Sequence, residues 1–195
     1  MSLTFKAVKK VFKDTRKKPW NEILQNLLGE VLNQKPEIIY IGDSLLSNFW
    51  RSPHLLKVDH FWTLNCDVSG DRLENVLYHI QQGIVTWHST IFVLQAGINN
   101  LLNGDPPEAI VNGLEVIFQE ILRIAPMCKI FLGTILPIEC NSKVGESLRR
   151  TNELIRTQVK SECRVTLVDH DKLTWHKDDG THVQGQGYET ACWKF

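Results

Sequence analysis

Apolar residues follow two alternating patterns along the chain. In some segments they recur every three or four residues, which is typical of an amphipathic helix. In others they form short continuous runs, which are typical of strands covered on both faces. Helices are expected over 20–33, 44–50, 73–80, 106–122 and 147–159, and strands over 38–41, 61–64, 90–94, 129–133 and 165–168.

Strands that alternate with helices predict a parallel sheet with helices on both faces. The expected fold is therefore a three-layer α/β/α sandwich around a five-stranded parallel sheet. The 195 residues suit one domain over 20–195, preceded by an arm over 1–19 that is rich in lysine and arginine. The arm is expected to be solvated rather than to form a binding patch.

Charge and composition exclude several function classes. Lys plus Arg and Asp plus Glu number 22 each, so no net field attracts nucleic acid or an anionic membrane. No segment has the length of a membrane span, and the start lacks the apolar core of a signal peptide. The five cysteines show neither Cys-x-x-Cys nor a zinc-type spacing. These features predict a soluble, cytoplasmic protein without stable membrane insertion.

The first predicted strand ends in Gly42-Asp43-Ser44. Gly42 permits a sharp exit from the strand and leaves Ser44 at its carboxyl end, where open α/β sheets place their chemistry. Taken alone, the same residues also suit a helix N-cap. The residues that follow the other strands decide whether Ser44 belongs to a helix cap or is a reactive serine.

Polar residues and glycines follow the other strands and are expected at the same sheet edge. A serine nucleophile needs a base, and a histidine base needs a carboxylate that orients it. Ser44, His182 and Asp179 provide this set, with Asp179 three residues before His182. The backbone N–H groups of Gly70 and Ser44 and the side-chain amide of Asn99 provide candidate oxyanion donors.

Four short blocks carry a family resemblance. They are Gly42-Asp43-Ser44-Leu45, Ser69-Gly70-Asp71, Gly97-Ile98-Asn99-Asn100 and Asp179-Gly180-Thr181-His182. In this order they resemble the blocks of the SGNH, or GDSL, hydrolases, and most of all the catalytic subunits of intracellular platelet-activating factor acetylhydrolase. The resemblance implies a flavodoxin-like fold and the catalytic roles given above. It implies no cofactor and no metal.

Some positions depart from the family pattern. Asp67 and Ser69 stand where the second block usually has glycines, so either an extra carboxylate faces the site or the loop bends differently. Asp178 is an alternative to Asp179 as the orienting acid. Asp43 is assigned to capping the next helix or bracing the turn.

The neighbours of the candidate catalytic residues are expected to line the acyl pocket. They are Leu45, Ile98 and Thr181. Two bulky aliphatic side chains favour a short acyl group. Trp50, Trp62 and Trp87 are instead expected in the core, because large aromatic residues dominate core burial.

The sequence therefore predicts a serine esterase that removes a short acyl group, acetyl above all, through an acyl-enzyme. The family resemblance suggests a phospholipid like platelet-activating factor as substrate, a homodimer, and a WD-repeat regulatory subunit as partner. Two alternatives remain open: a weakly active or inactive scaffold with the same fold, and a carbohydrate O-acetylesterase. A metal site formed by Asp169-His170-Asp171 with His176 is less favoured than an ordinary polar loop.

Overall fold

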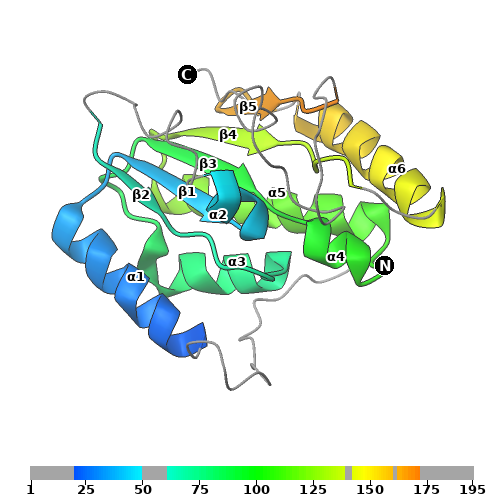
Figure 1. The fold of residues 1–195 in the computed structure, drawn as a ribbon. Helices are drawn as coiled ribbons and strands as arrows, with labels where there is room; N and C mark the ends of the chain where they lie inside the picture. Colours follow the sequence, from blue (N-terminus) through cyan, green and yellow to red (C-terminus); the bar gives the residue numbers. More distant parts are fainter. Residues whose placement is uncertain (1–19, 50–60, 139–141, 160–161, 172–195) are drawn as a thin grey trace.

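A parallel β-sheet runs through the middle of the molecule (Figure 1). The computed structural model describes residues 20–49, 61–138, 142–159 and 162–171. Its strands are β1 (Ile38–Gly42), β2 (Thr63–Asn65), β3 (Ile91–Gln95), β4 (Lys129–Gly133) and β5 (Val165–Val168). They lie in the order β2-β1-β3-β4-β5, and every neighbouring pair is parallel. This is the flavodoxin-like order, so the predicted five-stranded parallel sheet is confirmed.

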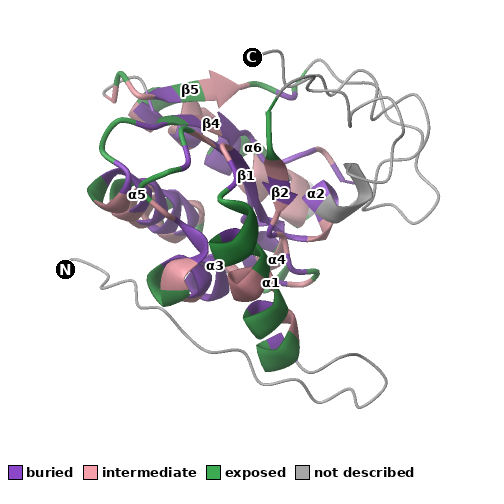
Figure 2. Cartoon of the chain, turned by 90° about the vertical axis from the view of Figure 1, so that its left-hand side faces the viewer, coloured by how far each residue is buried: buried purple, intermediate pink, exposed green. Residues whose placement is uncertain are grey.

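Helices cover both sides of the sheet. They are α1 (Trp20–Gln34), α2 (Ser44–Phe49), α3 (Leu73–His79), α4 (Ile98–Leu102), α5 (Pro107–Ile124) and α6 (Ser142–Gln158), with a π-helical turn η1 (Ile80–Ile84) after α3. Neighbours α3, α5 and α6 pack in a row on one face, and Figure 2 shows α2 on the other side of the sheet. The three layers agree with the predicted sandwich.

Helix α5 illustrates how the sequence determines these elements. Pro107 occupies its first position, where the missing N–H of proline costs no hydrogen bond. One stripe of the helix is buried, formed by Ile110, Leu114, Ile117 and Ile121. This stripe packs on the sheet as the helical spacing predicted. Among the described residues, no helix is both long and apolar enough to cross a bilayer.

Several elements differ from the sequence prediction in their bounds, and one was not predicted. Strand β2 begins at Thr63, where pairing with Ile38 begins, rather than at Phe61. Helix α6 begins at Ser142, earlier than expected. Helix α4 was not predicted, because its five residues are too few to show a helical period.

The burial predicted for two tryptophans is wrong. Trp62 is 69% exposed and Trp87 is 73% exposed. Trp62 immediately precedes β2, where its carbonyl accepts the N–H of Ile38 at 3.1 Å while its side chain stays exposed. Trp87 lies in the turn before β3, and its ring stacks on His88 with centroids 3.6 Å apart. Trp50 lies outside the described residues. Trp20, in contrast, is a core tryptophan and is 2% exposed.

Strand β1 is the most completely enclosed strand of the sheet. It pairs with β2 on one side and with β3 on the other, and all five of its residues are buried. A strand covered on both faces and paired at both edges needs a continuous apolar sequence, which Ile38-Ile39-Tyr40-Ile41 provides. Its carboxyl end is therefore held in a fixed position.

Gly42 ends this strand where the backbone of β3 comes very close. A Cβ atom at Gly42 would lie 2.0 Å from the carbonyl oxygen of Gln95. Because the contact is with backbone, no side-chain rotation can relieve it. Glycine is therefore required at position 42 for β1 to pair with β3 as far as Gln95.

Gly42→Ala should lower the free energy of unfolding by roughly 3 kcal/mol or more, because strands β1 and β3 must separate to admit the methyl group. Gly29→Ala is the matched control in α1, since a Cβ there meets nothing within 4 Å. This control should be neutral or should stabilise by about 0.5–1 kcal/mol. Urea denaturation of both variants measures the difference, and equal stability of the two would contradict the packing argument.

Candidate active site

Ser44 lies where strand β1 passes into helix α2. It is the first residue of α2 and is half-buried. The Asp43 carboxylate accepts the N–H of Leu45 at 3.1 Å, and the Asp43 carbonyl accepts the N–H of Leu46 at 3.1 Å. The helix cap predicted for Asp43 is therefore confirmed. The helix start is therefore held by the side chain and the carbonyl of Asp43.

The capping carboxylate is wholly enclosed, with none of its surface exposed. Burial raises the pKa of Asp43 to about 7, the backbone N–H groups of Leu45 and Gly97 lower it, and the nearby carboxylates Asp67 and Asp71 raise it further. Asp67 is the residue that replaces a family glycine, so the extra carboxylate does lie close to this strand end. Asp43 is consequently poised to change its charge near neutral pH.

The loop after β2 is fastened to the end of β1. The N–H of Val68 donates to the carbonyl of Gly42 at 3.1 Å, and the N–H of Asp71 donates back to Val68 at 3.1 Å. Between them, Gly70 adopts a φ of 77°, a value that suits glycine. These bonds bring the loop that carries Gly70 to the strand end that precedes Ser44.

The segment after β3 joins the same cluster. Gly97 adopts a φ of 116° and turns the chain into the short helix α4. The Asn99 side-chain amide then donates to the carbonyl of Asp71 at 2.8 Å. The structure therefore brings Ser44, Gly70 and Asn99 to one edge of the sheet through hydrogen bonds that link their three segments.

Asn100, the next residue, serves structure rather than the site. It is 2% exposed and accepts the N–H of Leu73 at 2.8 Å. Its own amide donates to Asp105 at 2.7 Å and to Glu74 at 3.1 Å. These bonds tie α4 to the start of α3, so Asn99 binds Asp71 of the second block and Asn100 binds the helix start that follows it.

Three of the predicted site residues, Asp179, Thr181 and His182, lie outside the described residues, as does the alternative acid Asp178. The proposed acid and base therefore stay predictions. Leu45 and Ile98 are each 2% exposed and belong to the core beside Ser44 and Asn99. Their role as acyl-pocket walls also stays a prediction.

The segment considered as a metal site forms a charged pair with helix α6. Arg156 binds both carboxylate oxygens of Asp169, at 2.7 and 2.9 Å, and also pairs with Asp171. Between these acids, His170 is 2% exposed, and burial lowers its pKa to about 4. The histidine is therefore neutral at physiological pH, and the two acids are already paired with a guanidinium group.

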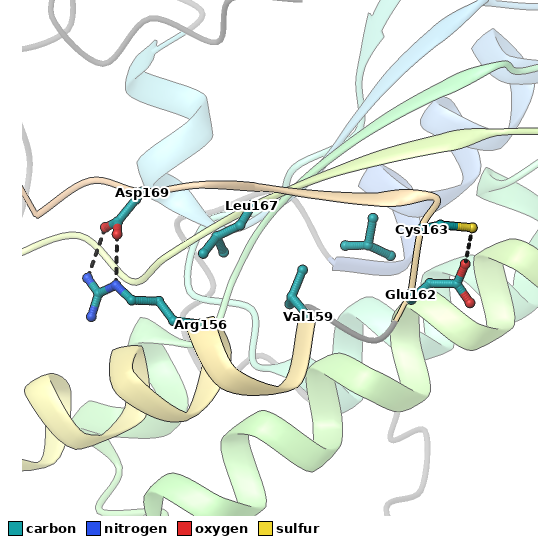
Figure 3. Close-up of a pocket in the computed structure, with 7 residues that line it drawn as sticks. Arg156, Val159, Glu162, Cys163, Leu167 and Asp169 are labelled. Carbon is teal, nitrogen blue, oxygen red and sulfur yellow. Dashed lines mark hydrogen bonds and ion pairs between the residues drawn. The ribbon is translucent and has the colours of Figure 1, made fainter.

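A cavity of about 480 Å³ lies along the edge strand β5 (Figure 3). It is lined by Arg156, Val159, Glu162, Cys163, Val165, Leu167 and Asp169. Strands β3 and β4 separate β5 from β1. The cavity is therefore distant from Ser44 and is not its acyl pocket.

Comparison with known protein families agrees with this arrangement of strand ends. Residues 40–190 match the model of the GDSL-like lipase/acylhydrolase family. The chain belongs to this family. It is thus a carboxylic ester hydrolase by class, and the family resemblance found in the sequence is confirmed.

Individual relatives point in the same direction. The alpha1 subunit of platelet-activating factor acetylhydrolase IB from Bos taurus is 26% identical over 89% of this chain and 79% of its own length. A solved Streptococcus pneumonia structure named for platelet-activating factor has a TM-score of 0.77 at 21% identity, covering 88% of both chains. A GDSL-like lipase from Bacteroides thetaiotaomicron has a TM-score of 0.68 at 14% identity, covering 85% of this chain and 93% of its own. The two structures show the shared fold.

Asp43→Asn should change how stability depends on pH. Between the ordinary aspartate pKa of about 4 and the raised value of about 7, the folded chain keeps a proton that the unfolded chain has lost. The contribution of Asp43 to stability therefore falls as pH rises through this window, by roughly 4 kcal/mol at most.

Asparagine cannot ionise. The free energy of unfolding of Asp43→Asn should therefore rise relative to that of the wild type from about pH 4 to 7, and the difference between the two should stay constant above about pH 7. Urea denaturation at a series of pH values measures the offset. An offset that does not vary with pH would show that Asp43 titrates as it does in the unfolded chain.

Proposed function

We propose that the protein is a serine esterase that hydrolyses short acyl esters, with Ser44 as nucleophile, His182 as base and Asp179 as its orienting acid. The Ser44 hydroxyl oxygen attacks the ester carbonyl while His182 accepts the hydroxyl proton. The tetrahedral intermediate collapses to an acyl-enzyme, and the leaving alkoxide takes that proton from the imidazolium. Water, deprotonated by the same imidazole, then releases the carboxylic acid and restores Ser44.

The observation that carries this proposal is the hydrogen-bonded cluster at the end of β1. The bonds from Val68 to Gly42 and from Asn99 to Asp71 hold two oxyanion-donor segments beside the segment of Ser44. A side-chain amide has two N–H hydrogens, and the bond to Asp71 uses one of them. In this proposal the second Asn99 hydrogen donates to the oxyanion, together with the N–H groups of Gly70 and Ser44.

The proposed substrate is an acetyl ester, such as a phospholipid like platelet-activating factor. Two arguments support it. Leu45 and Ile98, the chain neighbours of Ser44 and Asn99, are bulky aliphatic side chains, and as walls of the proposed acyl pocket they favour a short acyl group. The relative from Bos taurus is named as an acetylhydrolase of platelet-activating factor. A cytoplasmic homodimer that docks a WD-repeat regulatory subunit completes the proposal.

Ser44→Ala should abolish hydrolysis of p-nitrophenyl acetate in a folded protein, because the proposed mechanism uses the Ser44 hydroxyl as its nucleophile. Ser147→Ala removes a hydroxyl on α6 and should keep wild-type turnover. Initial rates with purified proteins of equal circular dichroism measure both. Unchanged turnover in Ser44→Ala would disprove the nucleophile.

Asn99→Ala should lower kcat by about 10²–10³-fold if the amide stabilises the oxyanion, because the donor acts mainly in the transition state. Asn103→Ala removes an amide at the other end of α4 that donates to Asp105 at 3.0 Å, and it should leave kcat unchanged. Steady-state kinetics separate kcat from KM. A loss confined to KM would make Asn99 a substrate-binding group instead.

A panel of acetylated lipids and acetylated glycans separates the remaining functions. Preference for the lipids supports the proposed substrate, whereas preference for the glycans identifies a carbohydrate O-acetylesterase. No turnover on any ester by the folded protein would favour a scaffold that keeps the fold without the chemistry.

A further inference from the structure

Asp71 is a buried carboxylate directly behind the candidate oxyanion donors. None of its surface is exposed. The indole N–H of Trp20 donates to one carboxylate oxygen at 3.0 Å, and the Nδ1 atom of His79 lies 3.5 Å from the other. A carboxylate taken out of water is costly unless it is paired and hydrogen-bonded. The partners of Asp71 therefore have to hold it in place.

Trp20 contacts both other members of this cluster. Its ring packs on the imidazole of His79 with centroids 4.6 Å apart and planes inclined by 33°. It also packs on Tyr78 at 5.5 Å. The first residue of α1 thus holds the Asp71 side chain and the end of α3 together, although Trp20 and Asp71 are 51 residues apart in sequence.

The backbone of Asp71 connects this cluster to the site. Its N–H donates to Val68 at 3.1 Å, and its carbonyl accepts the Asn99 amide at 2.8 Å. A buried side chain that is hydrogen-bonded at one oxygen and packed beside an imidazole at the other restricts the rotation of its own backbone. The direction of the Asp71 carbonyl, and with it the orientation of the Asn99 amide, depends on the contacts made by the side chain.

We propose that Asp71 is a positioning residue for ester hydrolysis: Trp20 and His79 hold its carboxylate so that its carbonyl directs the second Asn99 amide hydrogen at the oxyanion. This inference rests on the proposed function and adds three residues to it. Oxyanion donors act through their preorganised direction, and misplacement by about 1 Å can cost 10²-fold in rate. The start of helix α1 thereby controls the rate without touching substrate.

A double-mutant cycle tests this coupling. Trp20→Phe keeps an aromatic ring on His79 and removes the N–H that Asp71 accepts, so kcat should fall by about tenfold with KM unchanged. In the Asn99→Ala background the same substitution should cost nothing further, because the donor that it positions is absent. Tyr78→Phe, on the other neighbour of the Trp20 ring, is the matched control and should keep wild-type kcat.

The possible outcomes are distinct. An equal loss from Trp20→Phe with and without Asn99 would overturn the coupling, as would wild-type kcat in Trp20→Phe. If Ser44→Ala remained active, the proposed function itself would fail, whatever the cycle shows. Additive losses combined with an inactive Ser44→Ala would remove only the positioning role.

A second measurement does not depend on activity. The Asn99 side-chain amide signals can be identified by their loss from the ¹⁵N–¹H spectrum of Asn99→Ala. In Asp71→Asn, which keeps the acceptor for Trp20 but replaces the oxygen that faces His79, the Asn99 signals should shift or broaden. Unshifted Asn99 signals in both Asp71→Asn and Trp20→Phe would overturn the proposal.

Discussion

The enclosed strand β1 is the constraint on which the rest of the molecule depends. All of its residues are buried, and it pairs with a neighbouring strand along both edges. A polar functional group can therefore be placed only after the end of the strand. At that end the backbone of β3 comes so close that Gly42 has no room for a side chain. The first position open to chemistry is therefore the turn that starts at Asp43, and Ser44 follows within that turn.

Two buried carboxylates then organise the loops around this turn. Asp43 caps α2, and its burial and the neighbouring acids raise its pKa to about 7. Asp71 is held by Trp20 and His79, and its carbonyl accepts the amide of Asn99. Buried charges of this kind stabilise little by themselves. Their effect is to fix which way the surrounding backbone and amide groups point.

Much of this arrangement was predictable from local sequence. The continuous run before Gly42 predicted β1, the alternation of periods predicted the parallel sheet, and the position of Asp43 before a helix predicted its cap. Each depends on neighbouring residues alone. The same reasoning also identified the strand ends that carry Ser44, Gly70 and Asn99.

The remaining features depend on contacts between distant residues. Nothing next to Trp20 indicates that its indole binds a carboxylate in the second block, and nothing next to Trp62 indicates that its side chain is exposed at the start of β2. Asp71 offered one signal, an acid directly after a turn glycine at a strand end, but its partners His79 and Trp20 follow only from the packing of α1 on α3. Sequence periodicity predicts which face of a helix or strand is buried. It does not predict which polar groups form hydrogen bonds on that buried face.

The nucleophile is the central claim, and the position of a covalent adduct tests it most directly. The protein should be treated with a fluorophosphonate, digested and mapped by mass spectrometry while its esterase activity is followed. The account predicts one phosphonyl group on Ser44, formed in proportion to the loss of activity and slowed by competing p-nitrophenyl acetate. Full inactivation with the adduct on another residue, or an active esterase with Ser44 unlabelled, would contradict it.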